Sequence, residues 1–193
     1  VGGWGNTVAC VQCFVDGNET DTDKIPMTLN YGEEYTVSVN VGADMVRGFV
    51  NGEQIFQLGG EAPATTFAGA AGFGHWSTEA YVDNLKVVSF TDGSVLYENT
   101  FDDASSLDDL KHDLATYSGG TYTGDPAVFE WEDGTLHQTD SSMTGVISYF
   151  GDTTWRNYIY SMDVMPVAGA EGATILGAIN LDAPSYVLYN CGG

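Results

Sequence analysis

The chain has 193 residues, which is enough for one domain with its own hydrophobic core. It carries 5 basic against 27 acidic residues, a net charge of −22, and this negative field excludes nucleic acid and anionic membrane surfaces as partners. No apolar run approaches the roughly 20 residues of a membrane span.

Alternation of apolar and polar residues, the pattern of a half-buried strand, dominates the chain. It is clearest over residues 35–41 and 158–164. Further strands are predicted, in chain order, over residues 8–15, 44–50, 53–57, 80–90, 94–99, 127–131, 144–150, 173–180 and 185–190. The pairs Asp16-Gly17, Asn51-Gly52 and Asp133-Gly134 favour tight hairpin turns between strands.

Helical periodicity is nearly absent. One short helical turn is predicted within residues 104–115, with Ser105 or Ser106 as its N-cap. Residues 58–72, rich in Gly and Ala, are predicted to be the least structured. The acidic residues 18–23 are predicted to form a solvated loop, with coordination of Ca²⁺ as the alternative. Many short strands joined by glycine-rich turns predict an all-β sandwich or barrel.

Two internal segments resemble the closing and opening strands of concanavalin A-like, or laminin-G-like, sandwich domains. Residues 80–87, Ala-Tyr-Val-Asp-Asn-Leu-Lys-Val, are similar to the last strand of that fold, and residues 95–103, Val-Leu-Tyr-Glu-Asn-Thr-Phe-Asp-Asp, to its first strand. The chain ends, Tyr-Asn-Cys-Gly-Gly followed by Val-Gly-Gly-Trp-Gly-Asn-Thr, resemble a hairpin in the sandwich domain of bacterial family 51 α-L-arabinofuranosidases. The resemblance implies a two-sheet antiparallel jelly-roll β-sandwich.

The resemblance covers the chain in rotated order. Residues 1–92 correspond to the C-terminal half of a sandwich and residues 93–193 to the N-terminal half, together one domain equivalent. A slice through a tandem array and a circular permutation both explain this order. The halves either fold on each other or complete sandwiches with neighbouring copies of the chain, which would propagate into a filament.

The resemblance also implies a function in carbohydrate binding, where aromatic rings stack on sugars and polar side chains contact hydroxyls. Trp76 and its neighbour His75, within an expected loop at residues 72–77, are candidate ligand contacts, as are Trp4 and Asn6 in the terminal hairpin. Two further tryptophans are expected in the core, at positions Trp131 and Trp155. The predicted ligand is a polysaccharide of the arabinan or xylan type.

Catalysis is not expected. Hydrolases on this sandwich carry a Glu-x-Asp-x-x-Glu spacing that the sequence lacks, and His75, His112 and His137 lie in unrelated contexts. The chain is therefore predicted to be a non-catalytic, extracellular, lectin-like carbohydrate-binding module. The alternative is a structural tandem repeat of a surface adhesin or filament. With no signal peptide at Val1, a secreted protein would be present here as a mature fragment.

Related sandwiches often hold a structural Ca²⁺ between the first and last strands. The oxygen ligands available here are Asp83, Glu98, Asp102 and Asp103, although acids of this kind also cap turns. The three cysteines, Cys10, Cys13 and Cys191, do not make a disulfide framework. Cys10 could lie beside Cys191 on a neighbouring strand, but buried thiols are the expectation.

Overall fold

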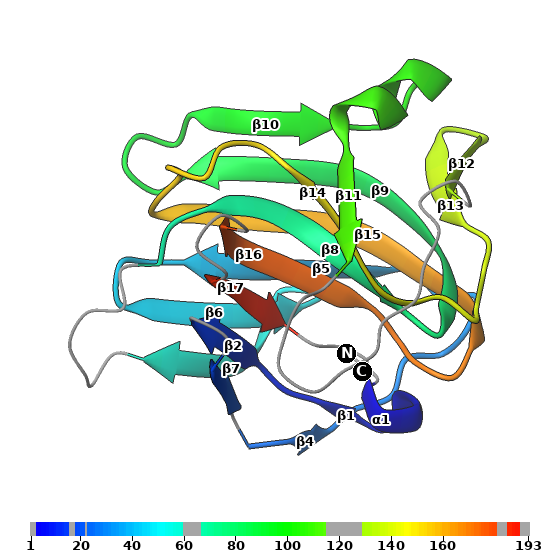
Figure 1. Ribbon diagram of the computed structural model, residues 1–193, viewed down its shortest axis with the longest axis horizontal. Helices are drawn as coiled ribbons and strands as arrows, with labels where there is room; N and C mark the ends of the chain where they lie inside the picture. Colours follow the sequence, from blue (N-terminus) through cyan, green and yellow to red (C-terminus); the bar gives the residue numbers. More distant parts are fainter. Residues whose placement is uncertain are drawn as a thin grey trace.

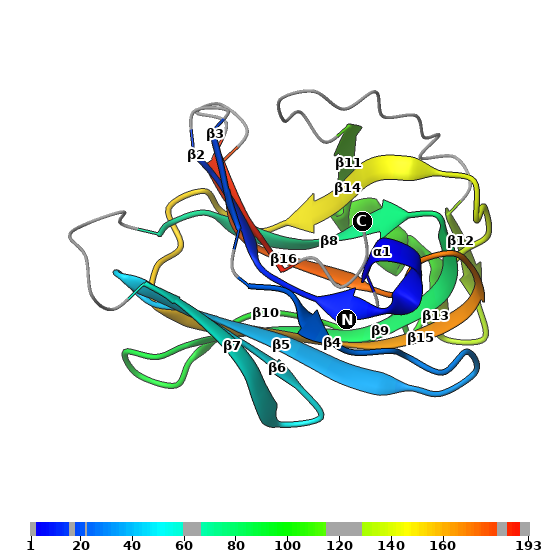
Figure 2. The same ribbon diagram turned by 90° about the horizontal axis from the view of Figure 1, so that it is seen from below.

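The computed structural model describes residues 3–15, 18–21, 23–59, 67–114, 129–180 and 185–189. Antiparallel strands provide nearly all of its regular structure, arranged in two large sheets and one two-stranded sheet. Figure 1 views the two large sheets face-on, and Figure 2 shows them stacked as separate layers. The predicted all-β, two-sheet antiparallel sandwich is confirmed.

The larger sheet has eight strands in the order β12-β13-β9-β15-β5-β6-β7, with β10 paired to β9. Its strands are β5 (Tyr35–Val41), β6 (Met45–Val50), β7 (Glu53–Gly59), β9 (Thr78–Ser89), β10 (Val95–Asn99), β12 (Phe129–Glu132), β13 (Thr135–Gln138) and β15 (Tyr158–Gly169). Because β15 occupies one edge of β9, β13 and β10 share the other edge. The face turned away from the second sheet is called the outer face.

The second sheet has seven strands in the order β11-β14-β8-β16-β17-β2-β3. These strands are β2 (Gln12–Val15), β3 (Asn18–Asp21), β8 (Ala70–Trp76), β11 (Lys111–Leu114), β14 (Thr144–Phe150), β16 (Thr174–Asn180) and β17 (Ser185–Tyr189). The small sheet pairs β1 (Val8–Ala9) with β4 (Ile25–Pro26). Two hairpin turns have left-handed backbones, as predicted, at Asn51-Gly52 and Asp133-Gly134.

The core lies between the two sheets and follows directly from the alternation. Val37, Val39 and Val41 of β5 are fully buried. The buried Tyr158 of β15 links the layers, since its hydroxyl donates to the Ala70 carbonyl at 3.1 Å and accepts from the Ala178 amide at 2.8 Å. A buried hydroxyl with a donor and an acceptor avoids the cost of an unpaired polar group.

Helical structure is limited to two short segments of the described residues. One is η1 (Ala104–Asp109), a 3₁₀ helix whose N-cap is Asp103 rather than the predicted Ser105 or Ser106. The other is α1 (Gly3–Asn6), which is a left-handed turn because Trp4 and Gly5 have positive φ angles. None of the helices in the described residues has the length and hydropathy needed to cross a membrane.

Two segments that the sequence predicts as loops are strands. The acidic stretch at 18–21 is β3, an edge strand paired with β2. The glycine-rich stretch at 70–76 is β8, which lies between β14 and β16 in the seven-stranded sheet. Alternation is weak in both because one lies at an edge and the other is covered on both faces.

The two halves of the sequence are interleaved within one chain. Strand β9 from the first half lies between β15 and β13 from the second, and β8 from the first half lies between β14 and β16. The hairpin that joins the halves pairs Val95 with Val88. Both large sheets therefore need strands from both halves.

We expect the protein to be a monomer of 20.6 kDa, because each sheet is completed by strands of the same chain. Static light scattering across a wide concentration range checks this. A constant mass supports the closed sandwich, whereas a mass that grows with concentration would show that neighbouring chains exchange halves.

Candidate functional site: an acidic cavity on the outer face

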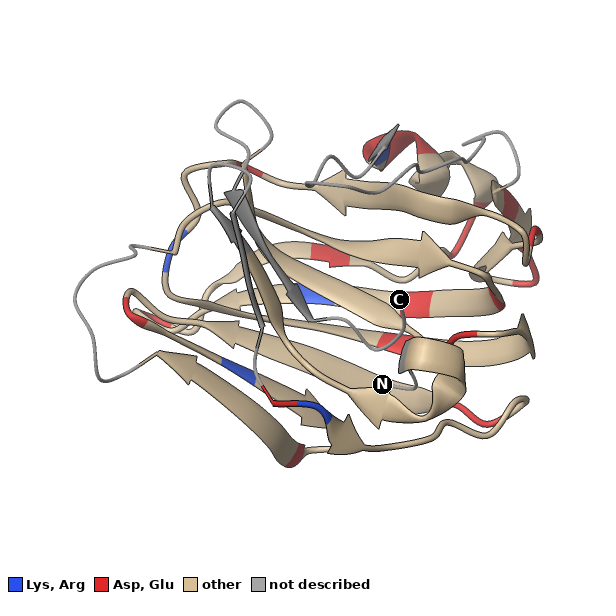
Figure 3. Ribbon diagram, turned by 60° about the horizontal axis from the view of Figure 1, so that its bottom comes forward, with Lys and Arg blue, Asp and Glu red and all other residues tan. Residues whose placement is uncertain are grey.

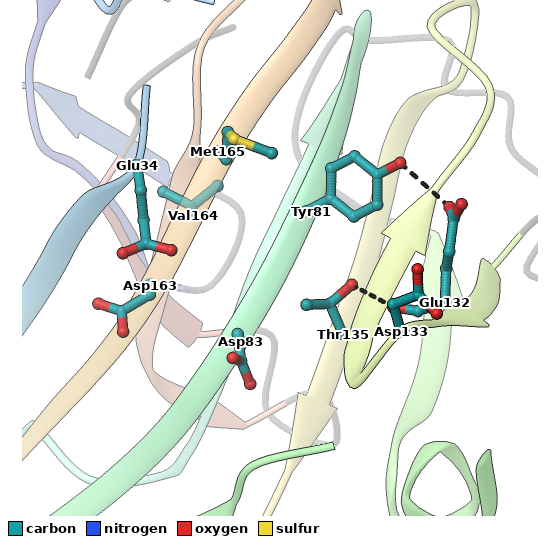
Figure 4. A pocket seen from close by; sticks show the side chains of 9 residues that line it. All are labelled: Glu34, Tyr81, Asp83, Glu132, Asp133, Thr135, Asp163, Val164 and Met165. Atoms are coloured by element: carbon teal, nitrogen blue, oxygen red, sulfur yellow. Dashed lines mark hydrogen bonds between the residues drawn. The ribbon is translucent and has the colours of Figure 1, made fainter. Parts of the chain in front are cut away.

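A cavity of about 260 Å³ opens on the outer face of the eight-stranded sheet. Tyr81 stands within it, with Glu34 and Asp163 to one side and Glu132 and Asp133 to the other (Figure 4). The full lining consists of Glu34, Tyr81, Asp83, Glu132, Asp133, Thr135, Asp163, Val164 and Met165. We call it the Tyr81 cavity.

Strand alternation and one β-bulge place these side chains. On β9, Ala80 and Val82 point into the core, so Tyr81 and Asp83 point outward. The bulge follows at Asn84, whose φ is 53°, and lets Asn84 also face outward while Leu85 returns to the core. Bulges of this kind re-aim side chains beside functional sites. The adjacent residues Asp83 and Asn84 therefore mark the position of this β-bulge.

One wall of the cavity is a hydrogen-bonded aromatic group. The Tyr81 hydroxyl donates to Glu132 at 3.0 Å, and the Tyr81 ring stacks on His137 with centroids 4.0 Å apart. His137 also contacts Glu132 at 2.7 Å and Glu79 at 3.2 Å through its two ring nitrogens. The bond to Glu132 raises the pKa of Tyr81 above its ordinary value. The ring is therefore held in one orientation with its hydroxyl protonated.

The opposite wall holds two carboxylates on neighbouring strands. Asp83 and Asp163 are paired in register, and Asp163 accepts hydrogen bonds from Thr36 at 2.6 Å and Asn84 at 2.9 Å. Partial burial raises the pKa of Asp83, and the negative charges of Asp163 and Asp102 add to that effect. Asp163 is fixed by its donors, while the carboxyl group of Asp83 is protonated more readily than an ordinary aspartate.

The charge of the cavity limits what it can bind. Five carboxylates contribute to its lining, and there is no lysine or arginine among its nine residues. Lys86, on the outer face of β9, is paired with Glu98 at 2.6 Å. Figure 3 shows how few basic residues interrupt the acidic ones on the described ribbon. Such a cavity repels anions and offers hydrogen-bond acceptors and one ring to a neutral polar ligand.

Trp76 and His75 do not lie in an exposed loop, so this prediction was wrong. Both belong to β8, and Trp76 is only 7% exposed, packed in a hydrophobic cluster with Ile147, Leu176 and Ile179. The glycines that suggest a loop are required by this packing. A Cβ at Gly74 would lie 2.0 Å from the Trp76 ring, and one at Gly72 would lie 2.3 Å from a β14 carbonyl.

His75 points into the sandwich instead. Its ring lies between Phe73 and Phe129, with centroid distances of 5.2 and 4.6 Å, and its Nε2 contacts the Ser148 hydroxyl at 3.2 Å. Complete burial, together with the charge of nearby His112, lowers the pKa of His75 to about 3. His75 is therefore a buried core histidine that stays neutral near pH 7.

Trp4 and Asn6 form part of the left-handed turn. The Asn6 side chain donates to the Leu29 carbonyl at 2.7 Å and accepts from the Leu29 amide at 2.9 Å, so it clamps two loops together. Trp4 is 36% exposed and carries the Lys24 ammonium 3.5 Å from its ring centroid. Asn6 thus has a structural role, whereas Trp4 is displayed at the surface as expected.

The four predicted calcium ligands are engaged in separate contacts. Glu98 pairs with Lys86, Asp102 accepts from Thr100 at 2.8 Å, and Asp103 caps η1 by accepting from the Ser105 amide at 2.9 Å. Asp83 accepts from the next backbone amide. In the described ranges no group of three or more His, Cys, Asp or Glu side chains is placed to hold a metal ion. Calcium binding itself stays a prediction.

The predictions for the other two tryptophans and for the cysteines are partly confirmed. Trp155 is partly buried against the core, but Trp131 is 38% exposed and donates from Nε1 to the Phe101 carbonyl at 2.7 Å. Its prediction as a core residue was therefore wrong. Cys10 and Cys13 are both buried, as expected, and Cys191 lies outside the described residues.

Sequence analysis did not single out Tyr81, Glu132 and Asp163 as members of one candidate site. The alternation of β9 and β15 does show that Tyr81, Asp83 and Asp163 lie on outward faces. The alternation does not show that β9 pairs with β15 and β13. This pairing brings Asp163 and the turn after Glu132 to the same cavity.

Comparison with known proteins gives one relevant similarity. A scan of protein families finds no match. A segment of an extracellular exo-α-L-arabinofuranosidase from Streptomyces chartreusis is 27% identical over 125 residues, or 65% of this chain. The chain is a distant relative of that segment. The match spans only 13% of the length of the enzyme.

Proposed function

We propose that this chain is a non-catalytic carbohydrate-binding module that binds a neutral polysaccharide of the arabinan or xylan class in the Tyr81 cavity. The observation that carries the proposal is the combination of one fixed aromatic ring with several carboxylate acceptors in a single cavity. Aromatic faces bind the apolar face of a sugar, and carboxylates accept from its hydroxyls.

Two observations support this choice of ligand. The related segment belongs to an extracellular arabinofuranosidase. The carboxylates of the cavity disfavour uronic-acid or sulfated polymers, since a like charge placed nearby in a partly desolvated cavity is repelled. A neutral arabinose- or xylose-based polymer fits both observations.

The proposal of a non-catalytic role rests on how the carboxylates are engaged. Glycoside hydrolysis needs one carboxyl group to donate a proton and a second to act as base or nucleophile. Asp163 accepts from Thr36 and Asn84, and Glu132 accepts from Tyr81 and contacts His137. These contacts hold both carboxylates in fixed positions at the cavity lining, which suits binding better than turnover.

Replacing Tyr81 with alanine is expected to weaken binding by about tenfold or more, equivalent to about 1.4 kcal/mol, because it removes the stacking surface. Tyr81→Phe keeps the ring and is expected to retain most of the affinity. Affinity electrophoresis through gels containing linear arabinan or arabinoxylan measures the change.

Tyr31→Ala serves as the matched control, because Tyr31 is an exposed tyrosine, 43% exposed, that does not line the cavity. It is expected to migrate like the wild type. Equal retardation of the wild type and Tyr81→Ala would place binding elsewhere. Wild-type migration unaffected by any neutral polysaccharide would remove the proposed function.

A further inference from the structure

A second cavity opens on the same outer face at the other end of the sheet. It has a volume of about 230 Å³ and is lined by Asn40, Gly42, Asp44, Met45, Arg47 and Phe90. Phe90 is 47% exposed, and its backbone amide is held by the Asn157 carbonyl at 2.7 Å. Arg47 is oriented by donating to Gln57 at 3.1 Å. We call this the Phe90 cavity.

Strand register shows that the two cavities share a face. Asn40 and Arg47 are paired across β5 and β6, and both point outward because Val41 and Val46 beside them are buried. Asn40 is also paired with Ile159 of β15. Further along β15 on the same face comes Asp163, which lines the Tyr81 cavity.

The surface between the cavities carries small side chains flanked by large ones. One row of paired residues crosses four strands there. It has two small side chains at its centre and a large side chain at each end, in the order Lys86, Ser161, Ser38 and Phe49. Ser161 and Ser38 are partly exposed and lie at the centre. The two serines place small side chains with hydroxyls on the outer face of β5 and β15, between the two cavities.

The distance between the two cavities exceeds the length of a small sugar. From Ile159, beside the Phe90 cavity, to Met165, in the Tyr81 cavity, is six residues of strand, or about 20 Å at about 3.3 Å per residue. A mono- or disaccharide would fill one cavity and leave the other vacant. An extended chain of several units would reach both.

We propose that the outer face binds the interior of an extended polysaccharide chain, which runs along β5 and β15 over the two serines and contacts Tyr81 at one end and Phe90 at the other. This inference rests on the proposed function and specifies its ligand as a continuous chain rather than a chain end. Two aromatic contacts on one polymer act together, because binding at one site raises the effective concentration at the other.

Three measurements test the inference. Calorimetry with linear arabino- or xylo-oligosaccharides of increasing length is expected to give affinity that keeps rising beyond the disaccharide until both cavities are occupied. Phe90→Ala is expected to weaken binding of the long oligosaccharides by about tenfold. Ser161→Tyr is expected to weaken it by a similar factor, because the added ring stands in the path between the cavities.

The control for Ser161→Tyr is Lys111→Tyr, which places the same ring at an exposed strand position of the seven-stranded sheet. Tyrosine suits strands, so both variants are expected to melt near the wild type, and only Ser161→Tyr to lose affinity. Equal affinity for the disaccharide and the longest oligosaccharide, or unchanged binding in Phe90→Ala and Ser161→Tyr, would overturn the extended-chain inference while the proposed function stands. Absence of binding to every neutral polysaccharide would overturn both.

Discussion

Replacing Trp76 with alanine is expected to lower the free energy of unfolding by about 3–5 kcal/mol, the range for truncating a large aromatic side chain in a core. The Trp76 ring lies over Gly74 and packs against Ile147, Leu176 and Ile179. Because a β-sheet backbone cannot collapse into the vacated space, most of the cavity would persist. Urea unfolding followed by circular dichroism measures the loss.

Trp4→Ala is the matched control, since Trp4 is the same residue type at 36% exposure. Its loss removes the contact with Lys24 and is expected to cost about 1 kcal/mol or less. If Trp76→Ala kept wild-type stability and instead lost polysaccharide binding, Trp76 would be a ligand contact and the packing described for β8 would be incorrect.

Acidification from pH 6.5 to 4.5 is expected to destabilise the protein through His75. The folded state holds this histidine neutral, with a pKa of about 3, because it is buried between the sheets. The unfolded chain binds a proton on it below about pH 6.5, so stability falls as the pH decreases, by roughly 1.4 kcal/mol per pH unit. Burial also lowers the pKa of His112, which contacts the same Ser148 hydroxyl, so its effect has the same sign.

His75→Gln tests this pH dependence, because glutamine keeps a polar contact for Ser148 without a titrating ring. Over these two pH units the wild type is expected to lose roughly 2–3 kcal/mol more than the variant. Surface carboxylates such as Asp92, whose hydrogen bonds lower its pKa, contribute only at more acidic pH and equally in both proteins. Parallel stability curves from pH 6.5 to 4.5 would contradict the buried, neutral state of His75.

The alternation of apolar and polar residues determined the fold class and most of the strands. The segment 35–41 is a strand with the predicted bounds, and 144–150 is another. This works because a strand with one buried face repeats every two residues, a property of local sequence. The turns at Asn51 and Asp133 were predictable for a similar reason, since few residues adopt left-handed conformations readily.

Strand pairing, by contrast, was decided only in the tertiary structure, and the site depends on it. Asp83 and Asp163 are 80 positions apart in the sequence, and the pairing of β9 with β15 sets them opposite each other. The burial of Trp76 was also decided by long-range packing. Its glycine-rich surroundings favour a loop locally, whereas close approach of neighbouring strands requires those glycines in a covered strand. Sequence thus indicated which residues face outward along each strand, and long-range packing decided which of them meet.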